Sequence, residues 1–357
     1  MSNRREFLIL PTVIAMSLAL LVRHSRAANV SEPNSGLKIF WLPAARPGAV
    51  GRPAFAAVLL GGAADVDYAT RFLCEHSHGG EIVVLRSSGG DDYNPYFHQL
   101  CPGNSVTTLL ITSAAGAADP AALRRVREAH AIFFAGGDQS NYVEFWPGPM
   151  LRELNADIAR GVPIGGISAG LAVLGQFVFS ARRDTITSPE AFANPFDERL
   201  TLDRNFLAIP VLRGIITDSH FSERSRMGRT IAFLARIVHD GWADPARAIG
   251  IDQETAVLID ANGKAVVVGK GSAYFLELAH QPEQCAPGKP LVVSGVRAYS
   301  IHGTTPPAAT AGSDRKSFDL DSFDLKFWTG RGGRSFTLDV ANDTLTRNDH
   351  QSPVTPR

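Results

Sequence analysis

Residues 162–175 read Val-Pro-Ile-Gly-Gly-Ile-Ser-Ala-Gly-Leu-Ala-Val-Leu-Gly: a short apolar strand, a Gly-x-Ser-x-Gly turn and the start of a helix. A sharp strand-to-helix turn of this kind puts Ser168 in a strained, exposed position, and its small neighbours avoid steric clashes. The backbone N–H of Ala169 would then lie at the helix N-terminus, where it can hold a developing oxyanion. The competing interpretation is a glycine-rich turn in which Ser168 only caps the helix.

Short apolar runs alternate with helix-like segments around this turn. Strands are expected at residues 55–60, 81–86, 106–111, 131–135 and 162–167, and helices at 65–76, 91–100, 119–129 and 150–160. A second run predicts strands at 214–218, 248–251, 256–260 and 264–268, a helix at 222–238, and strand-like pieces at 273–278 and 291–302. Such alternation is typical of an α/β fold with a largely parallel sheet that is covered on both faces.

The composition excludes several classes of protein. The 357 residues are 45% hydrophobic, and 35 basic and 35 acidic side chains leave a formal net charge of zero, which removes the electrostatic case for a dedicated nucleic-acid binder. The 33 glycines and 22 prolines follow no repeat period, so a collagen-like chain is excluded. Cys74, Cys101 and Cys285 are too few for a disulfide framework and do not suit a zinc ribbon. Whether Cys74 pairs with Cys101 or Cys285 stays open.

Residues 1–27 have the features of a signal peptide. Arg4 and Arg5 precede a largely apolar run at 7–22, which is too short and interrupted for a transmembrane helix. Small residues lie at the −3 and −1 positions of a cleavage site after Ala27, and residues 3–8 resemble a twin-arginine export signal. We expect export to the periplasm or the exterior, with no membrane contact after cleavage. An uncleaved N-terminal anchor is the alternative.

The remainder is expected to form one domain at residues 28–303 and a C-terminal extension at 304–357. The extension begins with a segment rich in Pro, Ala, Thr and Gly. Residues 342–357 are polar enough to be disordered.

A base is needed because an unactivated serine is a poor nucleophile. His220 directly follows an apolar strand that ends at the same sheet edge as Ser168, and sites in open α/β sheets form at the carboxyl ends of strands. The alternative is that His220 has only a structural role. Three arginines follow within nine residues: Arg224, Arg226 and Arg229. They are either a solvated helix face or, beside a nucleophile and base, bidentate binders of carboxylates.

A second strand-end loop reads Gly136-Gly137-Asp138-Gln139. Its glycines let the backbone approach a ligand, and Gln139 can donate or accept a hydrogen bond. An ordinary Gly-Gly turn is the alternative. The loop is not a phosphate loop, because no Gly-Lys-Ser/Thr follows it.

Together these motifs resemble the cyanophycinases, in the serine peptidase family that also contains aspartyl dipeptidase. The resemblance covers residues 56–278 and rests on residues 136–139, 165–170, 218–221 with the three arginines, and 250–256. It implies a flavodoxin-like or class I glutamine amidotransferase-like α/β sandwich, with a β-extension at the C-terminus. It also implies that Ser168 is the nucleophile and His220 the general base.

Family members release β-Asp-Arg dipeptides from cyanophycin, a poly-aspartate with arginine on its side-chain carboxyls, or cleave Asp-Xaa dipeptides. The family's substrate-binding positions correspond here to Gln139, Asp218, Ser219, Arg224, Arg226 and Arg229. Ser219 departs from the Gln of typical cyanophycinases. We expect the N–H groups of Ala169 and Gly137 to hold the oxyanion, and no metal or organic cofactor is implied. Family members commonly form homodimers, and the sequence leaves the oligomeric state open.

The third member of the catalytic triad departs from the family. The family has a Glu where this chain has Gln253, and a neutral amide stabilises an imidazolium poorly. Glu254 would point the opposite way in a strand unless a bulge turned it inward, and Asp252 is a further candidate. These alternatives stay open in the sequence.

The sequence thus predicts an exported serine exopeptidase that hydrolyses acidic or β-aspartyl peptides, with cyanophycin favoured as substrate. One alternative is a dipeptidase for short Asp-Xaa or β-Asp-Xaa peptides. Another is a peptide-binding homologue in which Gln253 marks an impaired triad, and a third is an esterase of the α/β-hydrolase type.

Overall fold

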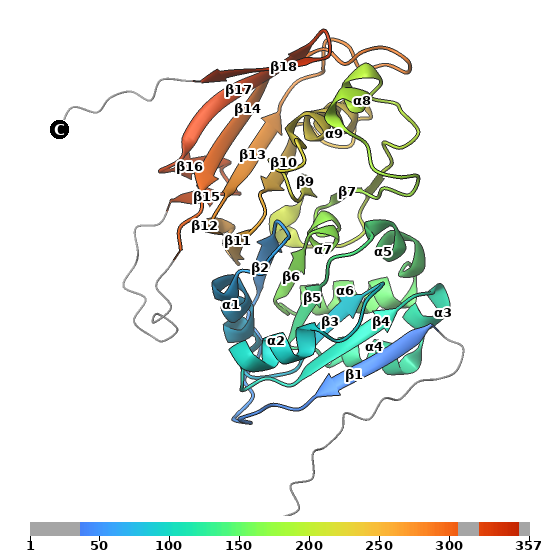
Figure 1. Ribbon diagram of the computed structural model, residues 1–357, viewed down its shortest axis with the longest axis vertical. Helices are drawn as coiled ribbons and strands as arrows, with labels where there is room; N and C mark the ends of the chain where they lie inside the picture. Colours follow the sequence, from blue (N-terminus) through green and yellow to red (C-terminus); the bar gives the residue numbers. More distant parts are fainter. Residues whose placement is uncertain (1–35, 306–320, 350–357) are drawn as a thin grey trace, which may run out of the picture.

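The computed structural model describes residues 36–305 and 321–349; the expected signal peptide lies outside these ranges. The strands form two sheets, one of ten strands and one of eight. In Figure 1 the parallel part of the first sheet occupies the lower half of the molecule, and the second sheet occupies the upper half. Within the described part of the chain, every helix is too short or too polar to cross a membrane.

The first sheet has the order β1-β4-β3-β5-β6-β2-β11-β12-β15-β16. Its strands are β1 (Leu37–Leu42), β2 (Ala56–Leu60), β3 (Ile82–Arg86), β4 (Val106–Ile111), β5 (Ala131–Phe134), β6 (Ile164–Ile167), β11 (Thr255–Asp260), β12 (Lys264–Gly269), β15 (Ser322–Asp324) and β16 (Thr329–Arg331). The run from β4 to β2 is parallel, and the strands at both ends of the sheet pair antiparallel.

Helices cover both faces of the parallel strands. The helices of this half are α1 (Asp67–Ser77), α2 (Tyr93–Leu100), α3 (Ala114–Ala117), α4 (Pro120–Arg127), α5 (Gln139–Phe145), α6 (Pro149–Ala159) and α7 (Ala169–Ala172). Successive strand residues point to opposite faces: Leu59 packs in the cluster that holds α4 and α6, whereas Leu60 packs with α1 and α2. Both faces are apolar because both are covered, so the expected α/β sandwich is confirmed.

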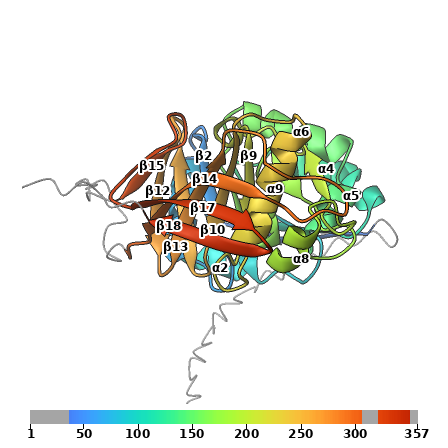
Figure 2. The same ribbon diagram turned by 90° about the horizontal axis from the view of Figure 1, so that it is seen from above.

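The second sheet has the order β18-β17-β14-β13-β10-β9-β7-β8. Its strands are β7 (Phe177–Phe179), β8 (Leu202–Arg204), β9 (Ile215–Asp218), β10 (Ala246–Ile251), β13 (Ser272–Leu278), β14 (Val293–His302), β17 (Arg334–Ala341) and β18 (Thr344–Asp349), accompanied by the helices α8 (Ser188–Ala193), η1 (Pro210–Leu212) and α9 (Met227–His239). The strands β7, β9 and β10 are parallel, and the others are antiparallel. Helix α9 runs alongside this sheet and buries its apolar stripe against it (Figure 2).

The two sheets share one core. Ile249 and Phe275 of the second sheet lie in the same buried cluster as Val257 and Val267 of the first. Because β10 and β11 are joined by a short turn, this packing fixes the carboxyl end of β9 beside that of β6. The site described below lies at this junction.

The helix expected at residues 222–238 begins five residues later, at Met227. Ser225 has a φ of 50°, which interrupts a right-handed helix, and the N–H of Arg226 donates to the carbonyl of Phe221. Residues 222–226 therefore form turns, so Arg224 and Arg226 precede the helix and do not share a face of it with Arg229.

The C-terminal extension is more ordered than the sequence suggests. Its strands β15 and β17 complete the first and second sheets by pairing with β12 and β14. The expectation of disorder from residue 342 is wrong over Thr344–Asp349, which pairs with β17 as an exposed edge strand. Asn342 and Asp343 have φ values of 51° and 57°, typical of a tight two-residue hairpin turn. An edge strand can be polar because one face meets solvent, which explains the misleading composition.

A disulfide joins Cys74 of α1 to Cys101 at the end of α2, 27 residues apart in sequence, whereas Cys285 is a buried free thiol. The bond ties together two helices that cover one face of the parallel strands, so it constrains the unfolded chain across a complete β-strand and two helices.

Replacing both Cys74 and Cys101 by alanine is expected to lower the free energy of unfolding by about 3 kcal/mol, because the open loop regains conformational entropy in the unfolded state. Urea unfolding with and without dithiothreitol measures this effect. The reductant should destabilise the unaltered protein and leave the double variant unchanged; equal sensitivity of the two proteins would contradict the assignment of the bond's role.

Candidate functional site

Ser168 forms the turn between β6 and α7. Its φ of 54° and ψ of −116° lie in a strained region for a residue with a side chain. A Cβ atom at Gly166 would lie 2.6 Å from the carbonyl oxygen of Gly170, and one at Gly170 would lie 2.1 Å from that of Phe134. Both flanking positions therefore require glycine. Among the described residues the Ser168 side chain makes no capping bond to α7, so the turn exposes its hydroxyl instead.

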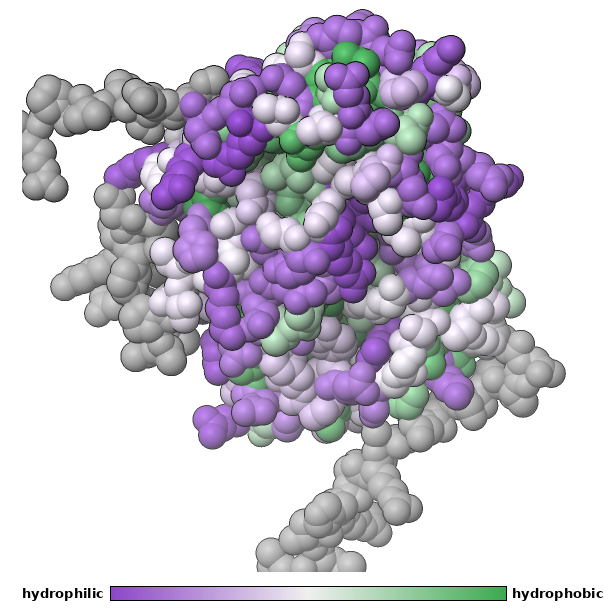
Figure 3. Space-filling view, turned by 45° about the horizontal axis from the view of Figure 1, so that its top comes forward, coloured by the Kyte–Doolittle hydropathy of each residue, from purple (hydrophilic) through white to green (hydrophobic). Residues whose placement is uncertain are grey.

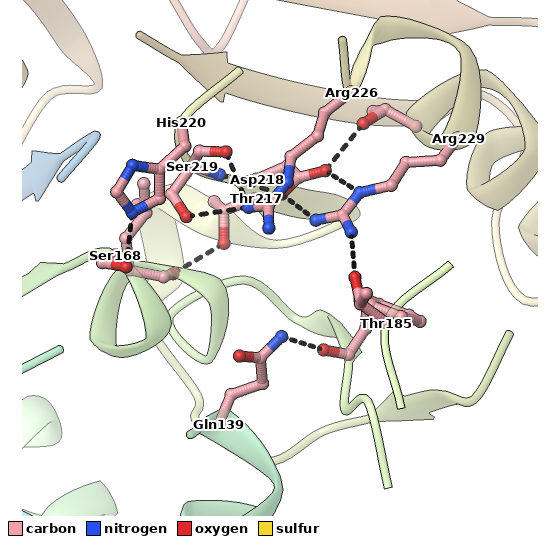
Figure 4. Close-up of polar contacts among 12 residues, drawn as sticks. Gln139, Ser168, Thr185, Thr217, Asp218, Ser219, His220, Arg226 and Arg229 are labelled. Carbon is pink, nitrogen blue, oxygen red and sulfur yellow. Dashed lines mark hydrogen bonds and ion pairs between the residues drawn. The ribbon is translucent and has the colours of Figure 1, made fainter. Parts of the chain in front are cut away.

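The Ser168 hydroxyl meets His220, which follows β9 in the second sheet. Its Oγ lies 2.7 Å from Nε2 of His220, within hydrogen-bond distance (Figure 4). The His220 backbone N–H donates to the carbonyl of Gly61 over 2.8 Å, and a Cβ atom at Gly62 would lie 2.3 Å from Cε1 of the imidazole. The Gly-Gly turn after β2 therefore packs directly against His220 and holds it in place.

Gln253 lies on the other side of the imidazole. Its side-chain Nε2 is 2.8 Å from Nδ1 of His220. Its backbone N–H donates to Oε1 of Glu223 over 3.0 Å, which holds the turn between β10 and β11 in place. Ser168, His220 and Gln253 thus form a continuous chain of polar contacts from three separate parts of the sequence.

The amide of Gln253 controls which imidazole nitrogen carries the proton. When Nε2 of Gln253 donates to Nδ1, the proton of neutral His220 lies on its Nε2, which then donates to Ser168 and cannot accept the serine proton. Turning the amide by half a rotation presents Oε1 to a protonated Nδ1 and frees the imidazole Nε2 as an acceptor. A glutamate at this position could only accept, so it would enforce the tautomer that a base requires.

Two other carboxylates lie close in sequence but away from Nδ1. Glu254, with a φ of 50°, pairs with Lys270 at the surface. Asp252 is buried, and its two oxygens accept from the backbone N–H groups of Ser222 and Ser272, each over 2.9 Å. Glu254 therefore lies outside the polar chain, because its carboxylate pairs with Lys270 at the surface. Asp252 also lies outside it, because its carboxylate accepts hydrogen bonds from backbone N–H groups.

The surroundings of His220 keep it neutral. Burial is the main cause that lowers its pKa to about 4, and the positive charges of Arg224 and Arg226 lower the pKa further. Asp218 opposes this effect. A low pKa keeps the imidazole unprotonated at neutral pH, which is the state that a general base needs.

Asp218, the last residue of β9, organises the arginines (Figure 4). Arg229 donates to both of its oxygens, with Nε at 2.8 Å and Nη2 at 2.6 Å, and Arg226 approaches to 3.3 Å. Thr230 donates a further hydrogen bond to the carboxylate. Burial by itself would raise the pKa of Asp218, but the Arg229 and Arg226 charges outweigh burial and lower it.

The arginines therefore differ in their roles. Arg229 is buried and held by Asp218, and Arg226 also donates to the carbonyl of Ser219 over 2.8 Å. Burial lowers the pKa of Arg226 to about 10. Arg224 is exposed, and within the described parts of the chain its guanidinium makes no ion pair. Of the three, Arg224 is the one whose charge is available to a ligand.

The loop after β5 lies against Ser168. A Cβ atom at Gly136 would lie 3.5 Å from Cβ of Ser168, and Gly137 and Gln139 line the adjoining cavity. Gln139 donates to the carbonyl of Phe179 over 3.4 Å. Ala169 is the first residue of α7, directly after the nucleophile. Gly136 thus lies against the Ser168 side chain, and Ala169 follows it directly in the chain.

Sequence reasoning missed three contributors to this region. Gly61 and Gly62 support His220, and the same strand-end Gly-Gly signal that singled out residues 136–137 was present there. Thr185 accepts from Nη1 of Arg229 over 3.0 Å, and no local pattern marks it because it comes from an irregular segment.

Comparison with known proteins gives relatives of one kind. No family model matches the chain. It is 29% identical over 175 residues to a cyanophycinase of Synechococcus elongatus, covering 48% of this chain and 49% of the relative. It is 28% identical over 177 residues to a cyanophycinase of Trichormus variabilis, covering 48% of this chain and 54% of the relative. The chain thus spans about half the length of the curated relatives it matches.

Among solved structures, a peptidase from an acI-B1 actinobacterium superimposes with a TM-score of 0.48 and 17% identity, covering 67% of this chain and 98% of that one. The sequence relatives confirm the family resemblance seen in the motifs. The chain is thus similar in sequence, over about half its length, to serine peptidases of the cyanophycinase kind.

Proposed function

We propose that this protein is a serine exopeptidase that hydrolyses acidic or β-aspartyl peptides, with cyanophycin as the favoured substrate. The observation that carries the proposal is the 2.7 Å contact between Ser168 Oγ and His220 Nε2 at a strained strand-to-helix turn. A strained nucleophile beside a neutral imidazole is the arrangement used for acyl transfer.

In the proposed reaction Ser168 Oγ attacks the scissile carbonyl carbon while its proton passes to Nε2 of His220. The N–H groups of Ala169 and Gly137 hold the resulting oxyanion. His220 then gives the proton to the leaving amine, which departs and leaves an acyl-enzyme. Water, deprotonated by the same imidazole, releases the acid and restores Ser168. The proximity of residues 136 and 168 supports this use of the β5 loop.

The charges around the nucleophile support an acidic substrate. Arg224 offers a guanidinium without an ion pair in the described part of the chain, and a guanidinium suits a carboxylate through bidentate hydrogen bonds. Arg226 and Asp218 hold Ser219 beside His220, and Gln139 has an amide that can position the peptide backbone. Asp-Xaa or β-Asp-Xaa dipeptides carry the same acidic group, so a dipeptidase acting only on short peptides is the closest alternative.

The Gln253 amide favours a second candidate, a peptide-binding homologue with impaired catalysis. The amide holds Nδ1 of His220 at 2.8 Å but brings no negative charge to the forming imidazolium. Such a protein would keep the binding cavity and turn over slowly or not at all.

We further propose that the protein is exported. The basic and apolar features of residues 1–27 support export, and the Cys74–Cys101 disulfide is of the kind that persists in oxidising compartments.

The mature protein is expected to release β-Asp-Arg from purified cyanophycin, and Ser168→Ala is expected to lower the rate by at least about 10³-fold, since the residual rate comes from binding and the oxyanion donors alone. Release of the dipeptide, followed by chromatography, measures this rate. A fluorophosphonate probe should label the unaltered protein and not the variant.

Cleavage of β-Asp-Arg or Asp-Xaa dipeptides without action on the polymer would identify the short-peptide enzyme. If a correctly folded protein shows neither labelling nor hydrolysis, its function is peptide binding without catalysis.

Gln253→Glu is expected to raise kcat by about tenfold or more, because a carboxylate fixes the proton on Nδ1 and stabilises the imidazolium. The negative charge also raises the pKa of His220 from about 4, and a base works only above its pKa. The acidic limb of the kcat/KM profile should therefore move to higher pH in the variant.

Gln253→Ala serves as the matched control, and it should fall below the unaltered protein in kcat. An unchanged rate and an unmoved limb in Gln253→Glu would show that residue 253 does not orient the base.

Asp218→Asn is expected to lower the free energy of unfolding by about 3 kcal/mol or more, since it leaves the buried Arg229 guanidinium without its counter-charge. Asp203→Asn removes a partly exposed ion pair with Arg182 and should cost less than about 1 kcal/mol. Chemical denaturation of both variants measures the difference, and equal losses would contradict a central role for Asp218.

A further inference from the structure

A cavity of about 390 Å³ opens beside the nucleophile, between the β5 loop, the segment after β9 and the irregular segment after β7. Its lining includes Gln139, Asp184, Thr185 and the arginines Arg224, Arg226 and Arg229. The face of the molecule shown in Figure 3 is dominated by hydrophilic residues, and its hydrophobic residues lie in small separate patches. Most residues that line the cavity are polar or charged, so it is suited to a polar ligand.

One wall of the cavity is positive. The buried Asp218 carboxylate offsets part of the charge of Arg226 and Arg229, as described above. Arg224 carries its charge without an ion-pair partner in the described ranges. These positive charges can bind the carboxylate of an acidic peptide.

The same cavity is also lined by a carboxylate, Asp184, which lies outside the motifs that carry the family resemblance. Arg182 and Arg183, which precede Asp184, form ion pairs with Asp203 and Glu198. Asp184 is exposed, and among the described residues the one hydrogen bond of its side chain is Oδ1 accepting from the N–H of Thr185 over 2.6 Å. Across residues 36–305 and 321–349 its carboxylate has no cationic partner, so it faces the cavity with an uncompensated charge.

The segment that carries Asp184 is held firmly against the catalytic half. Thr185 accepts from Nη1 of Arg229 over 3.0 Å, so the guanidinium that binds Asp218 also anchors this wall. Asp184 has a φ of 122° and Ala181 one of 49°, backbone conformations that side-chain-bearing residues adopt only when the surroundings enforce them. The carboxylate is thus presented from a fixed position.

We propose that Asp184 is a specificity-determining residue that binds a cationic side chain of the substrate, while Arg224 binds its acidic group. The inference rests on the proposed function, and it narrows the substrate class to peptides that carry both charges. A purely acidic peptide would meet the Asp184 carboxylate as a like charge, which disfavours its binding. A guanidinium or ammonium group offers Asp184 a charge-assisted hydrogen bond.

The test compares two peptides that differ only in charge: β-Asp-Arg and β-Asp-citrulline, whose uncharged urea group has nearly the shape of the guanidinium. Calorimetry with Ser168→Ala measures their binding without turnover. The arginine peptide should bind more tightly than the citrulline peptide, and adding Asp184→Asn should weaken it about five- to tenfold while leaving the citrulline peptide unchanged. Asp343→Asn, the same change in the exposed turn between β17 and β18, is the control and should alter neither affinity.

Equal affinities of the two peptides for Ser168→Ala, or an equal effect of Asp184→Asn on both, would overturn the proposal. Its failure is distinguishable from that of the proposed function, because hydrolysis is assayed separately in the protein that retains Ser168. Hydrolysis with no charge preference rejects the role of Asp184 alone, and a charge preference in binding without hydrolysis rejects the peptidase alone.

Discussion

The buried carboxylate of Asp218 is the constraint on which the rest of the site depends. It lies at the end of β9, and burial is tolerated only because Arg229, Arg226, Thr230 and a backbone N–H all donate to it. Arg229 extends the same network to Thr185 and so holds in place the segment around Thr185 that lines the cavity. One ion-paired cluster therefore sets the position of the residues before His220, the start of α9 and the segment that carries Asp184.

The polar chain through His220 joins both sheets. Ser168 comes from the first sheet, His220 from the second, and Gln253 from the turn that links β10 to β11. Gly62 is needed because the imidazole lies directly against its backbone, and Gly61 because a Cβ atom there would lie 1.9 Å from the carbonyl oxygen of Asp252. The packing of the sheets through Ile249 and Val257 is thus a requirement of the site as well as of stability.

The local sequence pattern was sufficient to predict those site residues whose position follows directly from the secondary structure. The parallel strands, the Ser168 turn and the position of His220 after β9 follow from apolar runs and glycine spacing. The local pattern failed where residues distant in sequence determine the environment of a side chain. Arg229 has the pattern of a solvated helix residue, but its hydrogen bonds to Asp218, eleven positions earlier, hold it in the interior. The direction of Gln253 depends on a turn that no periodicity encodes, and β18 is polar because it is an edge. Asp184 lies in an irregular segment and carries no motif at all.

The positive charges that would bind an acidic substrate in the proposed function also act on His220. Arg224 and Arg226 lower the pKa of His220, and Gln253 supplies no negative charge to oppose them. In the proposed reaction, a substrate carboxylate bound at Arg224 would offset one of these positive charges and make the imidazolium easier to form. The stabilisation that a triad carboxylate gives permanently would then come in part from the substrate, and only while it is bound. A peptide without an acidic group would lose both its anchor and this stabilisation, so selectivity and catalysis depend on the same guanidinium.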